Sequence, residues 1–122
     1  MTVLTEGRHA AECVLSEAQG MRSRESVTLD ESQTILAGQV LAIVTASGED
    51  AAYDEDGADG TENAAGIALY AETTGAGAPK AIAILRRDAE VNGNIIVWPS
   101  STDAGEKAAA IVQLAALGII VR

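Results

Sequence analysis

Residues 59–92, DGTENAAGIALYAETTGAGAPKAIAILRRDAEVN, carry the pattern that decides the fold. Two apolar runs, residues 64–71 and residues 80–85, are joined by a connection rich in Gly, Ala and Pro. Larger apolar side chains recur at every second position of these runs, and they are Ile67, Leu69, Ile82 and Ile84. Side chains two positions apart lie on the same side of a strand, so this spacing predicts two β-strands. No side chain here is equipped for catalysis, and the stretch is interpreted as scaffold.

The flanking segments supply further strands. Residues 40–45, VLAIVT, are apolar on both faces, which is typical of a strand buried on two sides. Residues 26–29 alternate between polar and apolar side chains and predict a shorter strand. After an Asn-Gly-Asn turn, residues 95–98 predict a strand that Pro99 stops, and residues 119–121 predict a terminal strand.

One helix is expected over residues 103–117. Asp103 and Glu106 are three residues apart just before an apolar series, which is the spacing of a capping box. Apolar residues then recur at helical spacing, and Gly118 is placed to end the helix. The sequence therefore predicts an α+β fold that is mainly β, a small barrel-like or sandwich-like domain with one C-terminal helix.

The first quarter of the chain differs in character from the rest. Residues 1–34 are polar and mixed, whereas residues 35–122 hold the apolar runs, so we expect an N-terminal arm followed by a β-rich domain. Within the arm, Ala11, Val14, Leu15 and Ala18 have helical spacing, which predicts a short helix. The alternative is an extended arm that becomes ordered only on a partner. Periodicity alone does not choose between the two.

Composition limits the possible functions. The chain has 122 residues, a net charge of −10, 48% hydrophobic residues and only 2% aromatic residues. This acidity disfavours nucleic acid and membrane surfaces as partners. Small apolar side chains bury little area each, which favours association of several copies. The start of the chain lacks the apolar core of a signal peptide, so we expect synthesis in a cytoplasm.

Catalytic and metal-binding chemistry is not expected. The single cysteine, Cys13, excludes an internal disulfide, and one histidine, His9, is too few for a zinc site. A His9–Cys13 pair lacks a third group to orient it. The acidic loop at residues 49–62 fails the spacing of a hand-type calcium loop, so a solvated loop is predicted. We expect no cofactor and no enzyme activity.

Five segments, taken in order, carry a family resemblance. They are residues 14–29 (VLSEAQGMRSRESVTL), residues 37–45 (AGQVLAIVT), residues 59–69 (DGTENAAGIAL), residues 86–92 (RRDAEVN) and residues 114–122 (LAALGIIVR). Together they resemble the head decoration proteins of lambda-like tailed bacteriophages. That resemblance implies a β-rich structural subunit of the virion, made in the bacterial host cytoplasm. It also implies trimers on the outside of the expanded capsid, which clamp the major capsid protein against the pressure of packaged DNA.

The resemblance further implies that the N-terminal arm reaches the capsid and adds strand pairing to it. We therefore assign capsid binding to residues 14–25, with Leu15 and Met21 as apolar anchors and Arg22 and Arg24 as pairing charges. The residues assigned to this contact are Val14, Leu15, Ser16, Glu17, Met21, Arg22, Ser23, Arg24 and Glu25. The possible trimer contacts are Ile67, Leu69, Ile82, Ile84 and Trp98.

A small soluble binding module outside any virion is the alternative function. Such a module would bind carbohydrate, or a metal ion in the acidic loop. Melting that depends on calcium or sugar would favour it, whereas indifference to both would favour capsid decoration.

Overall fold

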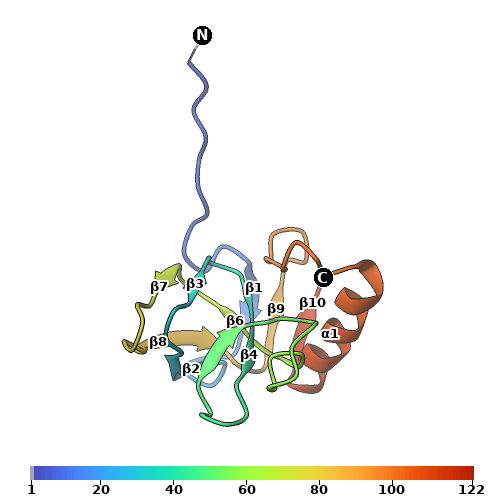
Figure 1. Cartoon of the computed structure of the whole chain (residues 1–122). Helices are drawn as coiled ribbons and strands as arrows, with labels where there is room; N and C mark the ends of the chain where they lie inside the picture. The colour runs from blue at the N-terminus through green and yellow to red at the C-terminus, as the bar shows by residue number, and fades with distance from the viewer. Residues whose placement is uncertain (1) are drawn as a thin grey trace.

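The computed structural model describes residues 2–122, which form ten strands and one helix. Figure 1 shows a β-rich body with the helix on one side and an extended N-terminal segment that projects from it. The strands are β1 Val14–Glu17, β2 Arg24–Leu29, β3 Thr34–Ile35, β4 Val40–Ile43, β5 Asp50–Ala52, β6 Ala64–Ala68, β7 Glu72–Thr73, β8 Lys80–Leu85, β9 Ala89–Val91 and β10 Ile119–Val121. The helix is α1 Ala104–Ala116.

Five strands close into a barrel in the order β2-β5-β4-β6-β8. The longest ladder joins β2 and β8 antiparallel, from Arg24 opposite Leu85 to Leu29 opposite Lys80. A parallel pairing of Leu29 with Asp50 joins β2 to β5 and completes the circle. The two strands predicted from residues 59–92 are confirmed as β6 and β8, and the strand predicted at residues 40–45 is confirmed as β4.

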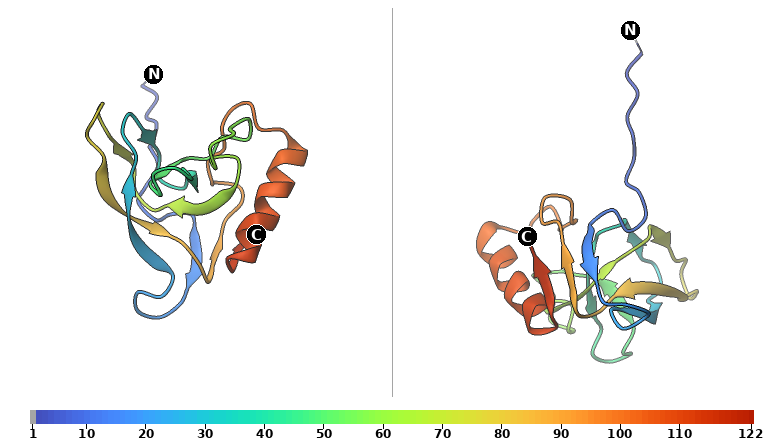
Figure 2. Two further views of the ribbon diagram at one scale, coloured as in Figure 1. Left: turned by 60° about the horizontal axis from the view of Figure 1, so that its bottom comes forward. Right: turned by 180° about the vertical axis from the view of Figure 1, so that it is seen from behind.

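A second sheet lies beside the barrel, with the order β1-β9-β10. Strand β1 pairs antiparallel with β9, and β10 pairs parallel with β9. Parallel neighbours need a crossover connection, and α1 provides it between β9 and β10. The helix packs against β10 and β6, as the two views of Figure 2 show. The predicted fold class, mainly β with one C-terminal helix, is confirmed.

The core is built from aliphatic side chains in two clusters. One lies between the barrel, the second sheet and α1, where Leu114 and Ile119 pack with Val40 and Ile67. The other lies in the barrel, and it comprises Leu29, Ile35, Leu41, Ala68 and Ile84. The chain has no phenylalanine, and Ala, Val, Ile and Leu fill most of the interior, together with Tyr53 and Cys13.

Helix α1 begins and ends as its sequence predicts. Asp103 accepts a hydrogen bond from the Glu106 backbone N–H at 2.8 Å, and the Glu106 side chain accepts one from the Asp103 N–H at 2.9 Å. This reciprocal capping box satisfies two donors that the first helical turn leaves free. Gly118 has φ +85°, a left-handed conformation that glycine adopts without strain and that ends the helix.

The N-terminal third departs from the prediction. Residues 14–17 form β1 instead of part of a helix, because pairing with β9 satisfies their backbone groups. Residues 24–29 form β2 and contribute a full side of the barrel. The folded body therefore begins near residue 10, well before the start expected at residue 35.

Two further local predictions are wrong. Residues 95–98 form no strand, and only Val97 makes an isolated bridge, with Gln39. The acidic loop was predicted to be solvated throughout, but its first part forms β5, with Asp50 and Ala51 buried.

Within residues 2–122, no helix is long and apolar enough to cross a membrane. The same residues contain no group of three or more His, Cys, Asp or Glu side chains that could hold a metal ion.

Candidate functional site

Residues 2–9 form a tail without secondary structure that projects from the body (Figures 1 and 2). Two of its side chains are apolar and almost fully accessible, Val3 at 79% exposure and Leu4 at 89%. Apolar side chains with this exposure gain contact area only when a partner covers them. We use the name "tail" for residues 2–9 below.

The tail is joined firmly to the body. The Ala11 N–H donates to the Leu69 carbonyl at 2.7 Å, and the Cys13 carbonyl accepts from the Asn92 N–H at 2.7 Å. Cys13 is 1% exposed within the main core cluster, and burial raises the pKa of its thiol. His9 pairs with Glu6 at 2.6 Å and not with the buried thiol. This thiol is therefore a packing group, because the thiolate is the reactive form.

Strand β1 follows the tail after a turn at residues 10–13 and lies at the edge of its sheet. Among the described residues it pairs with β9 on one side only, so its other side presents unpaired backbone groups. Leu15, on this strand, is 54% exposed, and Met21, in the turn after it, is 75% exposed. An extended tail, an open strand edge and two exposed apolar side chains thus adjoin each other in the chain.

The charged residues assigned to binding have different surroundings. Arg24 donates to Glu17 at 2.9 and 2.7 Å, and this contact lowers the pKa of Glu17. The Arg22 side chain is 71% exposed and lies 3.4 Å from Asp88. Of the two predicted pairing charges, Arg22 is the accessible one, because Arg24 is already held within the fold.

Ser23 has no surface to offer a partner. Ser23 is 0% exposed. Its hydroxyl donates a hydrogen bond to the Asp88 carbonyl at 2.7 Å and accepts one from the Ala18 N–H at 2.8 Å. It fixes the turn between β1 and β2 and thereby positions Met21 and Arg22. Ser23 was predicted to contact the capsid directly. Because it is buried, its part is instead to position the residues of this turn.

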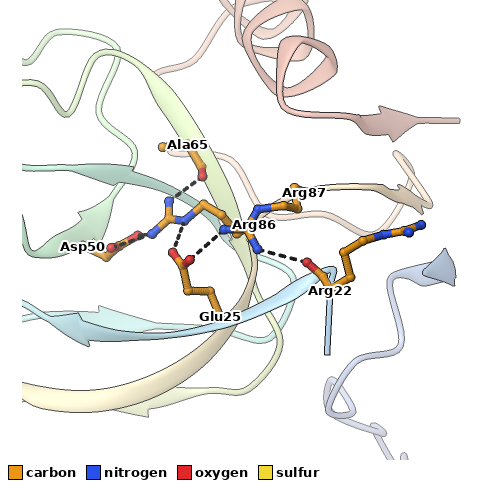
Figure 3. Close-up of polar contacts among 6 residues, drawn as sticks. All are labelled: Arg22, Glu25, Asp50, Ala65, Arg86 and Arg87. Atoms are coloured by element: carbon orange, nitrogen blue, oxygen red, sulfur yellow. Dashed lines mark hydrogen bonds and ion pairs between the residues drawn. The ribbon is translucent and has the colours of Figure 1, made fainter. Parts of the chain in front are cut away.

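A buried ion network lies behind this turn (Figure 3). One nitrogen of Arg86, Nη2, donates to both carboxylate oxygens of Asp50 at 2.9 Å, and Arg86 Nε donates to Glu25 at 3.2 Å. Arg87 donates to the other oxygen of Glu25 at 2.6 Å and to the Arg22 carbonyl at 3.0 Å. Glu25 is therefore held from two sides, and its carboxylate belongs to the scaffold.

Burial and pairing shift the pKa values of the carboxyl groups in this network. Asp50 is 1% exposed, and this desolvation raises the pKa of its carboxyl, an effect that the neighbouring Arg86 partly offsets. The pKa of Glu25 is lowered, chiefly by its hydrogen bond from Arg87. A buried ion pair of this kind fixes the arrangement of strands more than it stabilises them.

Three of the five predicted trimer contacts are internal. Ile67, Leu69 and Ile84 are each 0% exposed, so their side chains cannot touch a neighbouring subunit. The period-two pattern had identified the face of each strand that points into the core. Ile82 and Trp98 are half-buried and still offer surface.

Two groups of functional residues escaped sequence reasoning. Val3 and Leu4 were included in a polar arm but not named as contacts, and their only signal is that they are apolar residues outside any periodic segment. Asp50 and Arg86 looked like members of charged loops. A weak signal exists for both, because each directly adjoins a run of apolar residues in strand-like sequence.

The arrangement is suited to binding and not to covalent chemistry. Within residues 2–122, the buried titratable groups Asp50 and Arg86 are paired with each other, and the single cysteine is covered. What the surface does offer is an extended tail, an unpaired strand edge and exposed apolar side chains. These are the features of a protein that attaches to another protein.

The comparisons with known proteins agree with this interpretation. The family description "Bacteriophage lambda head decoration protein D" matches residues 3–119 of the chain. No curated protein matches the sequence. The matched residues run from the tail through the barrel and α1 to the first residue of β10, so the match describes nearly the whole fold and not a fragment of it. The family is one of structural capsid proteins, which places the chain in the phage head. The chain belongs to the bacteriophage lambda head decoration protein D family.

Proposed function

We propose that this chain binds the outer surface of the expanded phage head as a trimer and stabilises the head against the pressure of packaged DNA. The observation that carries the proposal is the tail with its exposed Val3 and Leu4, which leads directly into the open edge of β1. The family match supports the partner, the major capsid protein.

Strand addition is the proposed mode of attachment. An extended segment that joins an open strand edge gains main-chain hydrogen bonds, and its alternate side chains supply specificity. The tail can add to a capsid strand, and the edge of β1 can receive one. Three tails on one trimer then act together, so each needs only a weak contact of its own.

Side chains in residues 14–25 complete the proposed contact. Leu15 and Met21 act as the apolar anchors because both are more than half exposed. Arg22 provides a charge for the capsid, since within residues 2–122 its only ion pair is the 3.4 Å contact with Asp88. Arg24 and Glu25 act indirectly by holding the β1–β2 turn in place.

Of the two predicted trimer contacts that are half-buried, Ile82 is proposed to lie at the trimer interface, whereas Trp98 lines a groove near the C-terminus. A net charge of −10 opposes close approach of two copies, so an interface between them is expected where the surface carries few acids. Light scattering would test this part: a mass of three chains is expected, and a monomer at all usable concentrations would exclude it.

Removal of residues 2–9 tests the attachment. This deletion removes the contact of Arg8 with the Ile95 carbonyl but leaves every strand intact, because β1 begins at Val14 and the first backbone N–H bonded to the body is that of Ala11. We expect the shortened protein to fold and associate normally but to sediment with expanded, undecorated heads at least about tenfold more weakly.

The matched control keeps the tail length and removes its apolar groups. Val3→Ser with Leu4→Ser is expected to weaken attachment in the same direction, whereas Thr2→Ser with Thr5→Ser is expected to leave it unchanged. Normal coating of heads by the shortened protein would refute the role of the tail.

A further inference from the structure

A groove near the C-terminus is a second candidate contact surface. The groove near the C-terminus has a volume of about 510 Å³. We call it the C-terminal groove. Its lining includes four apolar side chains and two cations, and these are Ile96, Trp98, Ile111, Val121, Lys107 and Arg122.

Within residues 2–122, the lining of the C-terminal groove holds two basic side chains and no acidic one, although the protein as a whole is acidic. The chain has 18 acidic and 8 basic residues, yet no Asp or Glu is among the described residues that line this groove. Lys107 forms no ion pair within residues 2–122. Arg122 donates through Nε to Glu90 at 2.7 Å, and its side chain is 63% exposed. Both cations can therefore meet a carboxylate that arrives from outside.

The apolar wall of the groove is held in place. Trp98 packs edge-on against Tyr53, with ring centroids 6.0 Å apart and an angle of 81° between the rings. Tyr53 is itself buried in the core, so the orientation of the Trp98 ring is set before any ligand binds. A pre-ordered apolar wall beside two cations fits a segment with an apolar side chain and a carboxylate close together.

The groove lies next to the root of the tail. Arg8 Nη1 donates to the Ile95 carbonyl at 2.5 Å, and Ile95 is flanked by Asn94 and Ile96, which line the groove. Figure 1 shows the connection between β9 and α1 on the side of the body from which the tail projects. A partner that holds the tail is therefore close enough to reach the groove as well.

We propose that the C-terminal groove binds an acidic segment of the major capsid protein, with an apolar side chain against Trp98 and a carboxylate at Lys107 and Arg122. This inference rests on the proposed function and adds a second contact to it. Charge complementarity and the position of the tail root favour the capsid as the partner. A second copy of this chain in the groove is the rival outcome.

The test measures binding of the full chain to expanded, undecorated heads of its own phage by co-sedimentation. Lys107→Glu is expected to weaken binding by about tenfold or more, because like charges then face each other. Lys107→Arg should bind within about threefold of the wild type, since it keeps the charge. Residue 107 lies near the N-terminus of α1, where a negative charge interacts favourably with the helix dipole. The Lys107→Glu variant is therefore expected to fold.

The control is Lys80→Glu, which makes the same change in charge on β8, outside the groove, and in addition breaks the exposed 3.1 Å ion pair between Lys80 and Glu72. It should bind like the wild type. If Lys107→Glu binds as well as Lys80→Glu, the inference is wrong while the proposed function stands. If Lys107→Glu instead changes the number of chains in the oligomer, the groove belongs to a subunit contact and the inference is also overturned. Wild-type protein that fails to bind heads would refute the proposed function itself.

Discussion

Asp50 and Arg86 show how single residues hold this fold together. The two side chains join β5 to the segment that follows β8, and Arg86 also donates to the Ala65 carbonyl in β6 at 2.5 Å. One guanidinium therefore connects three parts of the barrel. Removing one partner of a buried pair leaves an uncompensated charge, which costs far more than the pair contributes.

Asp50→Asn is expected to lower the free energy of unfolding by about 3 kcal/mol, because Arg86 loses its buried counter-charge. Urea unfolding followed by circular dichroism measures the change. Glu25→Gln is the matched control, since the Glu25 side chain is 43% exposed, and it should cost less than about 1 kcal/mol. If both variants lowered the free energy of unfolding equally, the burial of Asp50 would not explain its contribution to stability.

Glu17 gives a prediction that depends on pH. Its hydrogen bond from Arg24 lowers the pKa of its carboxyl in the folded state below the value of 4.5 for a free side chain. A carboxyl with a lowered pKa stabilises the fold above its unfolded pKa, and this stabilisation is lost as the pH falls through the folded pKa.

The wild type should therefore be more stable than Glu17→Gln at pH 7, by up to about 1 kcal/mol, and the difference should be lost as the pH falls through the lowered pKa of Glu17 in the folded state. Thermal unfolding of both proteins across this range measures it. A difference that is constant with pH would show that the carboxylate charge plays no part.

At the scale of elements, the two ends of α1 allow a matched pair of substitutions. A Cβ at residue 118 would lie 2.7 Å from Asp88 Oδ1, and the backbone there has φ +85°. Gly118→Ala is therefore expected to destabilise the protein by about 1–2 kcal/mol. Gly105, in the first turn, has no such restraint, and Gly105→Ala should stabilise the helix by about 0.5 kcal/mol. Calorimetric melting that moved in the same direction for both variants would contradict this assignment.

The elements with a clear period were predictable from sequence. The period of two located β6 and β8, and the capping box with its apolar series located α1. Strand β1 was not predictable, because Val14 and Leu15 fit a helix as well as a strand and only the pairing with β9 decides between them. The burial of Asp50 likewise depends on Arg86, a residue distant in sequence.

The candidate site was predictable only in outline. The family resemblance pointed to the N-terminal region, but residues 14–25 turned out to lie largely within the fold. Exposure separates Leu15 and Met21, which can bind, from Ser23, which cannot. Sequence patterns show which residues suit a strand, but not which strand remains at the edge of a sheet.

At the scale of the whole molecule, the tail should be the first part to be cut by a protease. Trypsin is expected to cleave the free protein after Arg8, because this residue lies in an exposed segment without secondary structure. Mass spectrometry would show loss of residues 1–8 from an otherwise intact chain.

Attachment to heads should slow this cleavage by at least about tenfold, since a segment paired with a partner strand is no longer open to the protease. Protein bound to heads is compared with the same amount of free protein. Equal cleavage rates would mean that the tail stays free on the phage.

The way in which the tail joins the body has a mechanical consequence. Under the proposed function, the protein holds a pressurised shell and is pulled at its attachment points. Tension on the tail reaches the body at Ala11, bonded to Leu69, and two residues later at Cys13, bonded to Asn92 and buried in the core. The pull thus passes into the packed interior and is shared by the barrel and the second sheet, instead of peeling away a surface loop.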